Sequence, residues 1–122
     1  MTHSSVPVFA DVLDAAARIA PFATVTPVLH SRQLDGLAGA QLVFKAEHLQ
    51  RGGAFKFRGA CNAVWSLPAA VAAAGVVTHS SGNHGAALAL AARSRDISCH
   101  VVVPEGAVAA KGQQSDYPLA PI

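Results

Sequence analysis

The chain has 122 residues, 52% of them hydrophobic and 13% charged, so it is too apolar for a disordered protein and long enough for one small domain at most. Its formal net charge of +2 comes from nine Lys and Arg without a basic run, and only 6% of residues are aromatic, which argues against a nucleic-acid binder. The N-terminus lacks a signal-peptide pattern, and the longest apolar run, "LPAAVAAAGVV", is too short to span a bilayer. We therefore expect a globular cytoplasmic protein with neither nucleic acid nor membrane as partner.

The first half of the chain predicts one helix followed by extended segments. A helix is expected from Asp11, as its N-cap, to about Ala20, where Pro21 ends it. Its apolar face would consist of Val12, Leu13, Ala16 and Ile19. The segment "TVTPVLHS" is predicted to be extended, because the residue before a proline avoids the helical region, and "QLVFKAE" (41–47) reads as a strand.

The second half alternates helix and strand. Gly52 and Gly53 interrupt the chain before "AFKFRGACNAVWSL", whose later residues predict a helix ended by Pro68. After an alanine-rich stretch, "GVVTHS" is expected as a buried strand, "GAALALAARSR" as a helix and "ISCHVVVP" as a second strand. Strand, helix and strand with short connections form a parallel crossover unit, so the fold class is α/β.

The cysteines and histidines give no metal-binding pattern. Cys61 and Cys99 lack any CxxC or CxxH context and are expected to be small buried apolar residues. His79 and His84 are five positions apart, which is neither a helical i,i+4 pair nor a usual zinc spacing. We predict no metal site.

The loop "HSSGNHG" (79–85) carries the first candidate site, because it follows a strand and begins a helix, where open α/β sheets bind ligands. Free backbone amides at such a helix start favour a carboxylate or phosphate. Gly82 and Gly85 would let the backbone turn tightly and approach that ligand. The alternative is that Ser81 or Asn83 is only an N-cap and the glycines only make a turn.

Lys56 is the second candidate. It lies between Phe55 and Phe57, so we expect it to be partly desolvated, which favours the neutral amine that forms Schiff bases. The alternative is a surface lysine whose stem lies on the two rings. Arg58 is predicted to be a surface or phosphate-facing cation.

Taken together, these segments resemble a known family. "FKAEHLQRGGAFKFRGACNAV", then "VVTHSSGNHGAALALAA" and "VVVPEGA" closely resemble the serine racemase and threonine (serine) dehydratase family of pyridoxal phosphate (PLP) enzymes, of fold type II, which is tryptophan synthase beta-like. The resemblance covers about residues 7–111. It implies PLP as cofactor, a small amino acid as substrate, and homo-oligomeric full-length relatives.

The resemblance also implies roles for individual residues. Lys56 matches the lysine that forms the Schiff base with PLP and moves the proton at the substrate Cα, and Phe55 matches a residue packed beside the cofactor. Asn83 matches the residue that hydrogen-bonds the cofactor's 3′-oxygen. The substrate carboxylate would be held by the loop residues Ser80, Ser81, Gly82, Asn83 and His84.

Ser81 is the informative position for the reaction. In racemase-like members a serine here faces the side of the cofactor opposite the lysine and can return a proton there, so "SSGNHG" favours the racemase-like branch, in which β-elimination of water usually coexists with racemisation. The choice among serine, threonine and hydroxyaspartate stays open, as does that between elimination and racemisation. A cysteine synthase-like β-replacement enzyme is the alternative within the enzyme class, which the pairing of "FKFRGA" with "SSGNHG" disfavours.

The family pattern is lost after about Lys111, before the glycine-rich loop that would bind the PLP phosphate. We therefore expect a partial fold type II enzyme truncated before its second half. Residues 1–111 would be its N-terminal part, with large-domain elements over about 1–75, the start of the small domain over about 76–111, and a divergent tail over 112–122. We expect no PLP catalysis from this polypeptide alone, which leaves a non-catalytic fragment or interaction module as the alternative outside the enzyme class.

Overall fold

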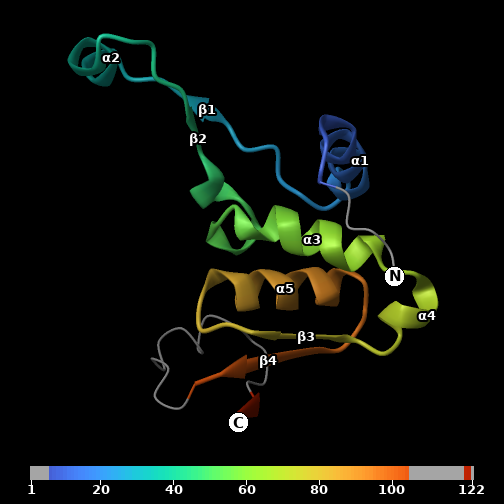
Figure 1. Cartoon of the computed structure of the whole chain (residues 1–122). Coiled ribbons are helices and arrows are strands. Elements are labelled where there is room, and N and C mark those ends of the chain that lie inside the picture. Colours follow the sequence, from blue (N-terminus) through green and yellow to red (C-terminus); the bar gives the residue numbers. More distant parts are fainter. Residues whose placement is uncertain (1–5, 105–119, 122) are drawn as a thin grey trace.

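The computed structural model describes residues 6–104 and 120–121 and has the mixed α/β architecture expected. In Figure 1, helices α3 and α5 lie side by side, α5 covers the sheet that contains β3 and β4, and α1 lies on the far side of α3. In chain order the elements are α1 (Phe9–Ile19), β1 (Val28–Leu29), α2 (Arg32–Ala38), β2 (Phe44–Lys45), η1 (Glu47–Leu49), η2 (Arg51–Gly53), α3 (Lys56–Ser66), α4 (Ala69–Ala72), β3 (Val76–His79), α5 (Asn83–Ser94), β4 (Cys99–Val103) and β5 (Ala120–Pro121).

Helix α1 has its N-cap three residues earlier than the sequence predicts. Its N-cap is Val8, so the prediction of Asp11 as N-cap is wrong. Asp11 lies in the first turn instead, where its Oδ2 accepts a hydrogen bond from the Val8 backbone N–H at 2.7 Å. Ile19 is the one residue of α1 that is buried. Val12 and Leu13 on the predicted apolar face are each 56% exposed. The face is therefore largely uncovered.

The segment between α1 and α3 forms an arm that projects from the helical body, with α2 at its tip (Figure 1). Strands β1 and β2 pair antiparallel, with Val28 opposite Lys45 and Leu29 opposite Phe44. The strand predicted over 41–47 is thus only two residues long, because the chain turns into the 3-10 helix η1 at Glu47. Gly39 ends α2 at a positive φ of 63°.

The predicted strand–helix–strand unit is confirmed. β3 and β4 pair in parallel, with Val76 opposite Cys99, and α5 forms the crossover between them. β4 also pairs in parallel with β5. The prediction of a buried β3 is wrong, since Val77 is 70% exposed. α5 packs against one face of β3 and β4. Val76 packs against the core on that side, and Val77, the next residue of the strand, points to the opposite face.

Most of the core lies between α3 and α5. The buried side chains of this cluster are Ile19, Phe57, Ala60, Cys61, Val64, Ala87, Leu88 and Ala91. The C-terminal ends of the two helices are joined: Trp65 Nε1 donates to Ser94 Oγ at 3.1 Å, and Arg95 Nη2 donates to the Leu67 carbonyl at 2.8 Å. The helices therefore run in the same direction, and their N-terminal ends share one end of the molecule (Figure 1).

This cluster contains residues that precede position 75 and residues that follow it. The predicted division at about position 75 into large-domain and small-domain elements stays a prediction. The predicted tail, 112–122, lies outside the described residues except for β5. Cys61 is buried as expected, whereas Cys99 is only half-buried, and burial raises the pKa of both thiols. Over residues 6–104 and 120–121, no helix is long and apolar enough to cross a membrane.

Candidate active site

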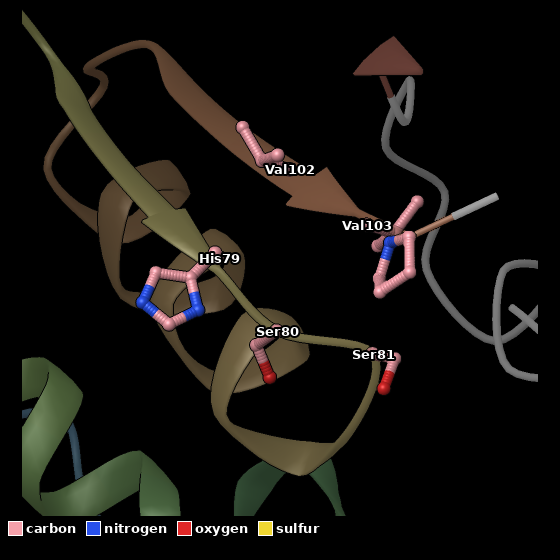
Figure 2. A pocket seen from close by; sticks show the side chains of 6 residues that line it. His79, Ser80, Ser81, Val102 and Val103 are labelled. Carbon is pink, nitrogen blue, oxygen red and sulfur yellow. The ribbon is translucent and has the colours of Figure 1, made fainter. Parts of the chain in front are cut away.

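The loop after β3 connects the carboxyl end of this strand to the start of α5, and it lies beside the carboxyl end of β4. The Ser80 backbone N–H donates to the Val102 carbonyl at 3.0 Å, which extends the pairing of β3 with β4 by one residue. The Gly82 N–H then donates to Ser80 Oγ at 3.3 Å, so the chain turns into the helix. A pocket of about 400 Å³ opens beside this loop, with Ser80 and Ser81 on its edge (Figure 2). Its lining residues are His79, Ser80, Ser81, Val102, Val103 and Pro104.

The amino end of α5 offers backbone donors. Gly82 is the N-cap, so neither Ser81 nor Asn83 has that role, and no side chain caps the helix. The N–H groups of Gly85 and Ala86 donate to the Gly82 carbonyl, at 3.1 and 3.5 Å. The amides of Asn83 and His84 precede them and have no acceptor within the helix, which leaves them able to bind an anion. The side chains of Ser81, Asn83 and His84 are all exposed.

The two glycines of the loop have different roles. A Cβ built on Gly82 would meet no atom within 4 Å, so this position leaves the backbone open to a ligand. On Gly85 a Cβ would lie 2.9 Å from Val101 Cγ1 and 3.1 Å from the Ser80 carbonyl oxygen. The prediction that Gly85 approaches the ligand is therefore wrong: it is buried and lets α5 pack closely on β4.

Lys56 is the first residue of α3, and its surroundings differ from those expected. Its Nζ lies 5.1 Å from the centroid of the Phe55 ring, and Phe55 is itself 61% exposed. Phe57 points into the core and is fully buried. Successive residues of a helix project about 100° apart, so the two rings cannot enclose the lysine. The expected desolvation is absent, because Lys56 is exposed.

A polar network lies behind the first turn of α3. Arg58 donates from Nε to Glu47 Oε2 and from Nη2 to Glu47 Oε1, both at 2.8 Å. Thr26 Oγ1 donates to Glu47 Oε1 at 2.5 Å, and Lys45 Nζ donates to Thr26 Oγ1 at 2.6 Å. The hydrogen bonds from Arg58 hold the pKa of Glu47 at about 2. Arg58 is thus paired with a carboxylate, a partner that the sequence analysis missed.

The short connection before Lys56 is fastened to the segment that follows α1. The buried Gln50 side chain exchanges two hydrogen bonds with the Thr24 backbone, from Thr24 N–H at 2.9 Å and to its carbonyl at 2.8 Å. Gly52 and Gly53 then turn the chain at φ values of 72° and 67°. The glycine pair predicted to break the chain does so immediately before the lysine-bearing turn.

The structure brings the predicted site residues to one end of the molecule. Phe55 and Lys56 lie at the start of α3, and the Ser80–His84 loop lies at the start of α5, beside the carboxyl ends of β3 and β4 (Figure 1). Within residues 6–104 no hydrogen bond joins the two groups. The arrangement provides one amine and, facing the same end, a set of backbone amides and hydroxyls.

Comparison with known proteins identifies the family. Residues 19–116 match the family model described as pyridoxal-phosphate dependent enzyme, and the chain belongs to this family. It is 59% identical over 101 residues to a serine racemase of Arabidopsis thaliana, and the match covers 80% of this chain and 30% of the relative. It is 52% identical over 106 residues to a beta-hydroxyaspartate dehydratase of Paracoccus denitrificans (87% of this chain, 34% of the relative).

Solved structures agree with the fold. Maize serine racemase superposes with a TM-score of 0.86 at 46% identity, over 93% of this chain and 35% of that one. A threonine deaminase of Solanum lycopersicum gives a TM-score of 0.80 at 28% identity, over 93% of this chain and 33% of that one. The fold is therefore that of PLP fold type II enzymes, and the chain spans about a third of the length of the relatives it matches.

The family depends on PLP, and the described residues fit part of this cofactor. An exposed primary amine on Lys56 suits its aldehyde, and the open backbone at Gly82 leaves room for a planar group beside the amides of α5. After position 85 the sequence has two glycines, Gly106 and Gly112, and they are not adjacent.

Proposed function

We propose that this chain carries the lysine and the substrate-carboxylate loop of a PLP-dependent enzyme. That enzyme racemises a small β-hydroxy amino acid or eliminates water from it, which after hydrolysis gives a keto acid and ammonia. One observation carries the proposal: the helices that begin with Lys56 and Asn83 run in the same direction, so their starts share one end of the molecule with the carboxyl ends of the strands. The names of the relatives, serine racemase and hydroxyaspartate dehydratase, support this substrate class.

Each residue has a distinct part in the proposal. The free amides of Asn83 and His84, with the hydroxyl of Ser80, bind and orient the substrate carboxylate. The amine of Lys56 takes the proton from the substrate Cα, and the Ser81 hydroxyl delivers a proton from the other face. The Asn83 side chain holds the cofactor ring, and the Phe55 ring packs beside it. When bound, PLP supplies the electron withdrawal that acidifies the Cα–H bond.

Two further features belong to this proposal. A cytoplasmic location is supported by the two free cysteines, Cys61 and Cys99, in a chain with no other cysteine. Homo-oligomerisation is proposed for the full-length enzyme by resemblance to its family.

A chimera tests the activity. Residues 1–111 of this chain are joined to the remaining part of the Arabidopsis relative, and D-serine and pyruvate are measured after addition of L-serine. The chimera should form at least one product, and Lys56→Ala should lower its rate roughly 10²- to 10⁴-fold, because the proton-transfer group is lost. Arg93→Ala, which removes an exposed cation from the last turn of α5, is the control.

Full activity in the Lys56→Ala chimera would overturn the proposal. A chimera that folds and binds PLP but forms neither product would also contradict it, and would favour the non-catalytic interaction module instead. Folding is checked by circular dichroism, and PLP content is measured after release with alkali.

A further inference from the structure

We infer that the ion pair between Glu47 and Arg58 positions Lys56 by holding the first turn of α3 against the extended segment 24–26. The inference rests on the proposed function, in which Lys56 supplies the reacting amine. Arg58 lies two residues after Lys56 in the same turn. Its two hydrogen bonds to the Glu47 carboxylate, both 2.8 Å long, are bidentate, the geometry that fixes a guanidinium most firmly in orientation.

The acceptor side of this pair is itself fixed. Glu47 Oε1 accepts from Thr26 Oγ1 at 2.5 Å, and Thr26 is only 3% exposed. Arg58 Nη2 donates a further bond to the Thr24 carbonyl at 3.2 Å, and Lys45 Nζ donates to the Thr26 carbonyl at 2.7 Å. The network therefore connects α3 to two other segments of the chain, 24–26 and 45–47.

Besides the buried Phe57 ring and the network around Arg58, few side chains hold the start of α3. No side chain caps it, no acidic residue lies in its first turn, and Gly52 and Gly53 precede it at positive φ. Its first backbone bonds are turn bonds, from Phe57 N–H to the Ala54 carbonyl at 3.4 Å and from Arg58 N–H to the Phe55 carbonyl at 3.1 Å. A helix start of this kind frays when its side-chain restraints are removed, and Lys56 would then move with it.

The opposite end of α3 provides a matched control. Arg95 donates to the carbonyls of Val64 and Leu67 and so holds the last turn of the same helix. Arg95→Gln should loosen the end remote from Lys56, whereas Glu47→Gln should loosen the end that carries it. Each variant removes the charge from one partner of a charge-assisted hydrogen-bonded group at one end of α3. A difference between the variants at Lys56 therefore reports position along the helix rather than overall stability.

The experiment uses the whole chain, without PLP, and two NMR readouts. Amide hydrogen exchange is measured at Arg58 and at Leu67, whose N–H donates to the Val64 carbonyl. In ¹³C-lysine-labelled protein, the ε-methylene signal of Lys56 is followed, because the Phe55 ring 5.1 Å from its Nζ displaces that signal from the position of free lysine. Phe55→Leu assigns the signal, since it removes the ring.

In Glu47→Gln, we expect exchange at the Arg58 amide to rise about tenfold or more and the Lys56 signal to move toward free lysine. In Arg95→Gln, exchange should rise at Leu67 while the Lys56 signal stays in place. Arg58→Lys, which keeps the charge and loses the bidentate geometry, should resemble Glu47→Gln, and it replaces that variant should Glu47→Gln not fold.

An unchanged Lys56 signal and unchanged Arg58 exchange in folded Glu47→Gln and Arg58→Lys would overturn the inference. Equal disturbance of Lys56 by Arg95→Gln would overturn it as well. The NMR measurement uses no cofactor or substrate, so its result is independent of the chimera assay. A chimera whose activity does not depend on Lys56 would refute the proposed function without changing the positioning measurement.

Discussion

At the scale of single residues, the sequence suggested candidate groups but could not predict what surrounds them. Lys56 and the Ser80–His84 loop could be selected because "FKFRGA" and "SSGNHG" together resemble a family of PLP enzymes. Whether Lys56 is exposed depends on which way the first turn of α3 faces, and Gly85 owes its role to Val101, sixteen positions along the chain, whose Cγ1 a Cβ would meet. Such contacts arise only on folding.

Ser81→Ala separates the two proposed reactions. In the chimera, formation of D-serine should fall roughly 10²- to 10⁴-fold, because the proton donor on the second face is lost, while formation of pyruvate changes by no more than a few fold. Ser98→Ala, at an exposed serine in the turn before β4, is the control. Equal loss of both products in Ser81→Ala would show that Ser81 serves binding rather than the second proton transfer.

Gly85→Ala tests the close packing of α5 on β4. The added Cβ would lie 2.9 Å from Val101 Cγ1 and 3.1 Å from the Ser80 carbonyl oxygen, so the free energy of unfolding should fall by about 1–3 kcal/mol. Gly59→Ala, on α3 where a Cβ meets nothing within 4 Å, should instead raise it by about 0.5–1 kcal/mol. Urea unfolding measures both, and a loss in Gly59→Ala as large as in Gly85→Ala would contradict the packing explanation.

At the scale of elements, periodicity and helix-breaking residues predicted α3, α5 and the parallel pairing of β3 with β4. The errors concern what covers an element and where it begins. β3 reads as buried because it begins with two valines, yet only the face toward α5 is covered. The ion pair between η1 and α3 could not be foreseen, because Glu47 and Arg58 are brought together by the turn at Gly52 and Gly53.

Stability should depend on pH through Glu47. Its pKa of about 2 in the folded chain is lower than the ordinary value of 4.5, so folding favours the ionised carboxylate. The stabilisation is fully present above about pH 4.5 and is lost as the pH falls toward about 2. The free energy of unfolding of Glu47→Gln should vary less over this range than that of the unaltered chain, as measured by urea unfolding at several pH values. Parallel pH curves for the two proteins would contradict this account.

At the scale of the whole molecule, the sequence predicted the family and the α/β class, and the comparisons confirm both. Large apolar side chains are exposed on α1 and along the arm, among them Phe9 (74%), Val25 (94%) and Leu37 (80%). The exposure of α1 and the arm could not be predicted from local pattern, because it depends on contacts between residues that are remote in sequence.

These exposed side chains should contribute little to folding stability. Leu37→Lys should change the free energy of unfolding by less than about 0.5 kcal/mol and improve solubility. Leu88→Ala, at a core position only 7% exposed, should cost about 2–5 kcal/mol. Urea unfolding and light scattering of the two variants measure the difference, and a large loss in Leu37→Lys would mean that the tip of the arm is packed in solution.

The central claim, that the lysine and the loop after β3 face one site, can be tested on the chain itself by cross-linking. Ser81→Cys, in a chain where Cys61 and Cys99 are replaced by serine, is treated with a short reagent that joins a thiol to an amine, and the product is mapped by mass spectrometry. Of the three lysines, Lys45, Lys56 and Lys111, we predict that Lys56 is the one joined to the new thiol at position 81 in the folded protein. A folded chain in which the reagent joins position 81 to Lys45, or leaves Lys56 unmodified, would contradict the account.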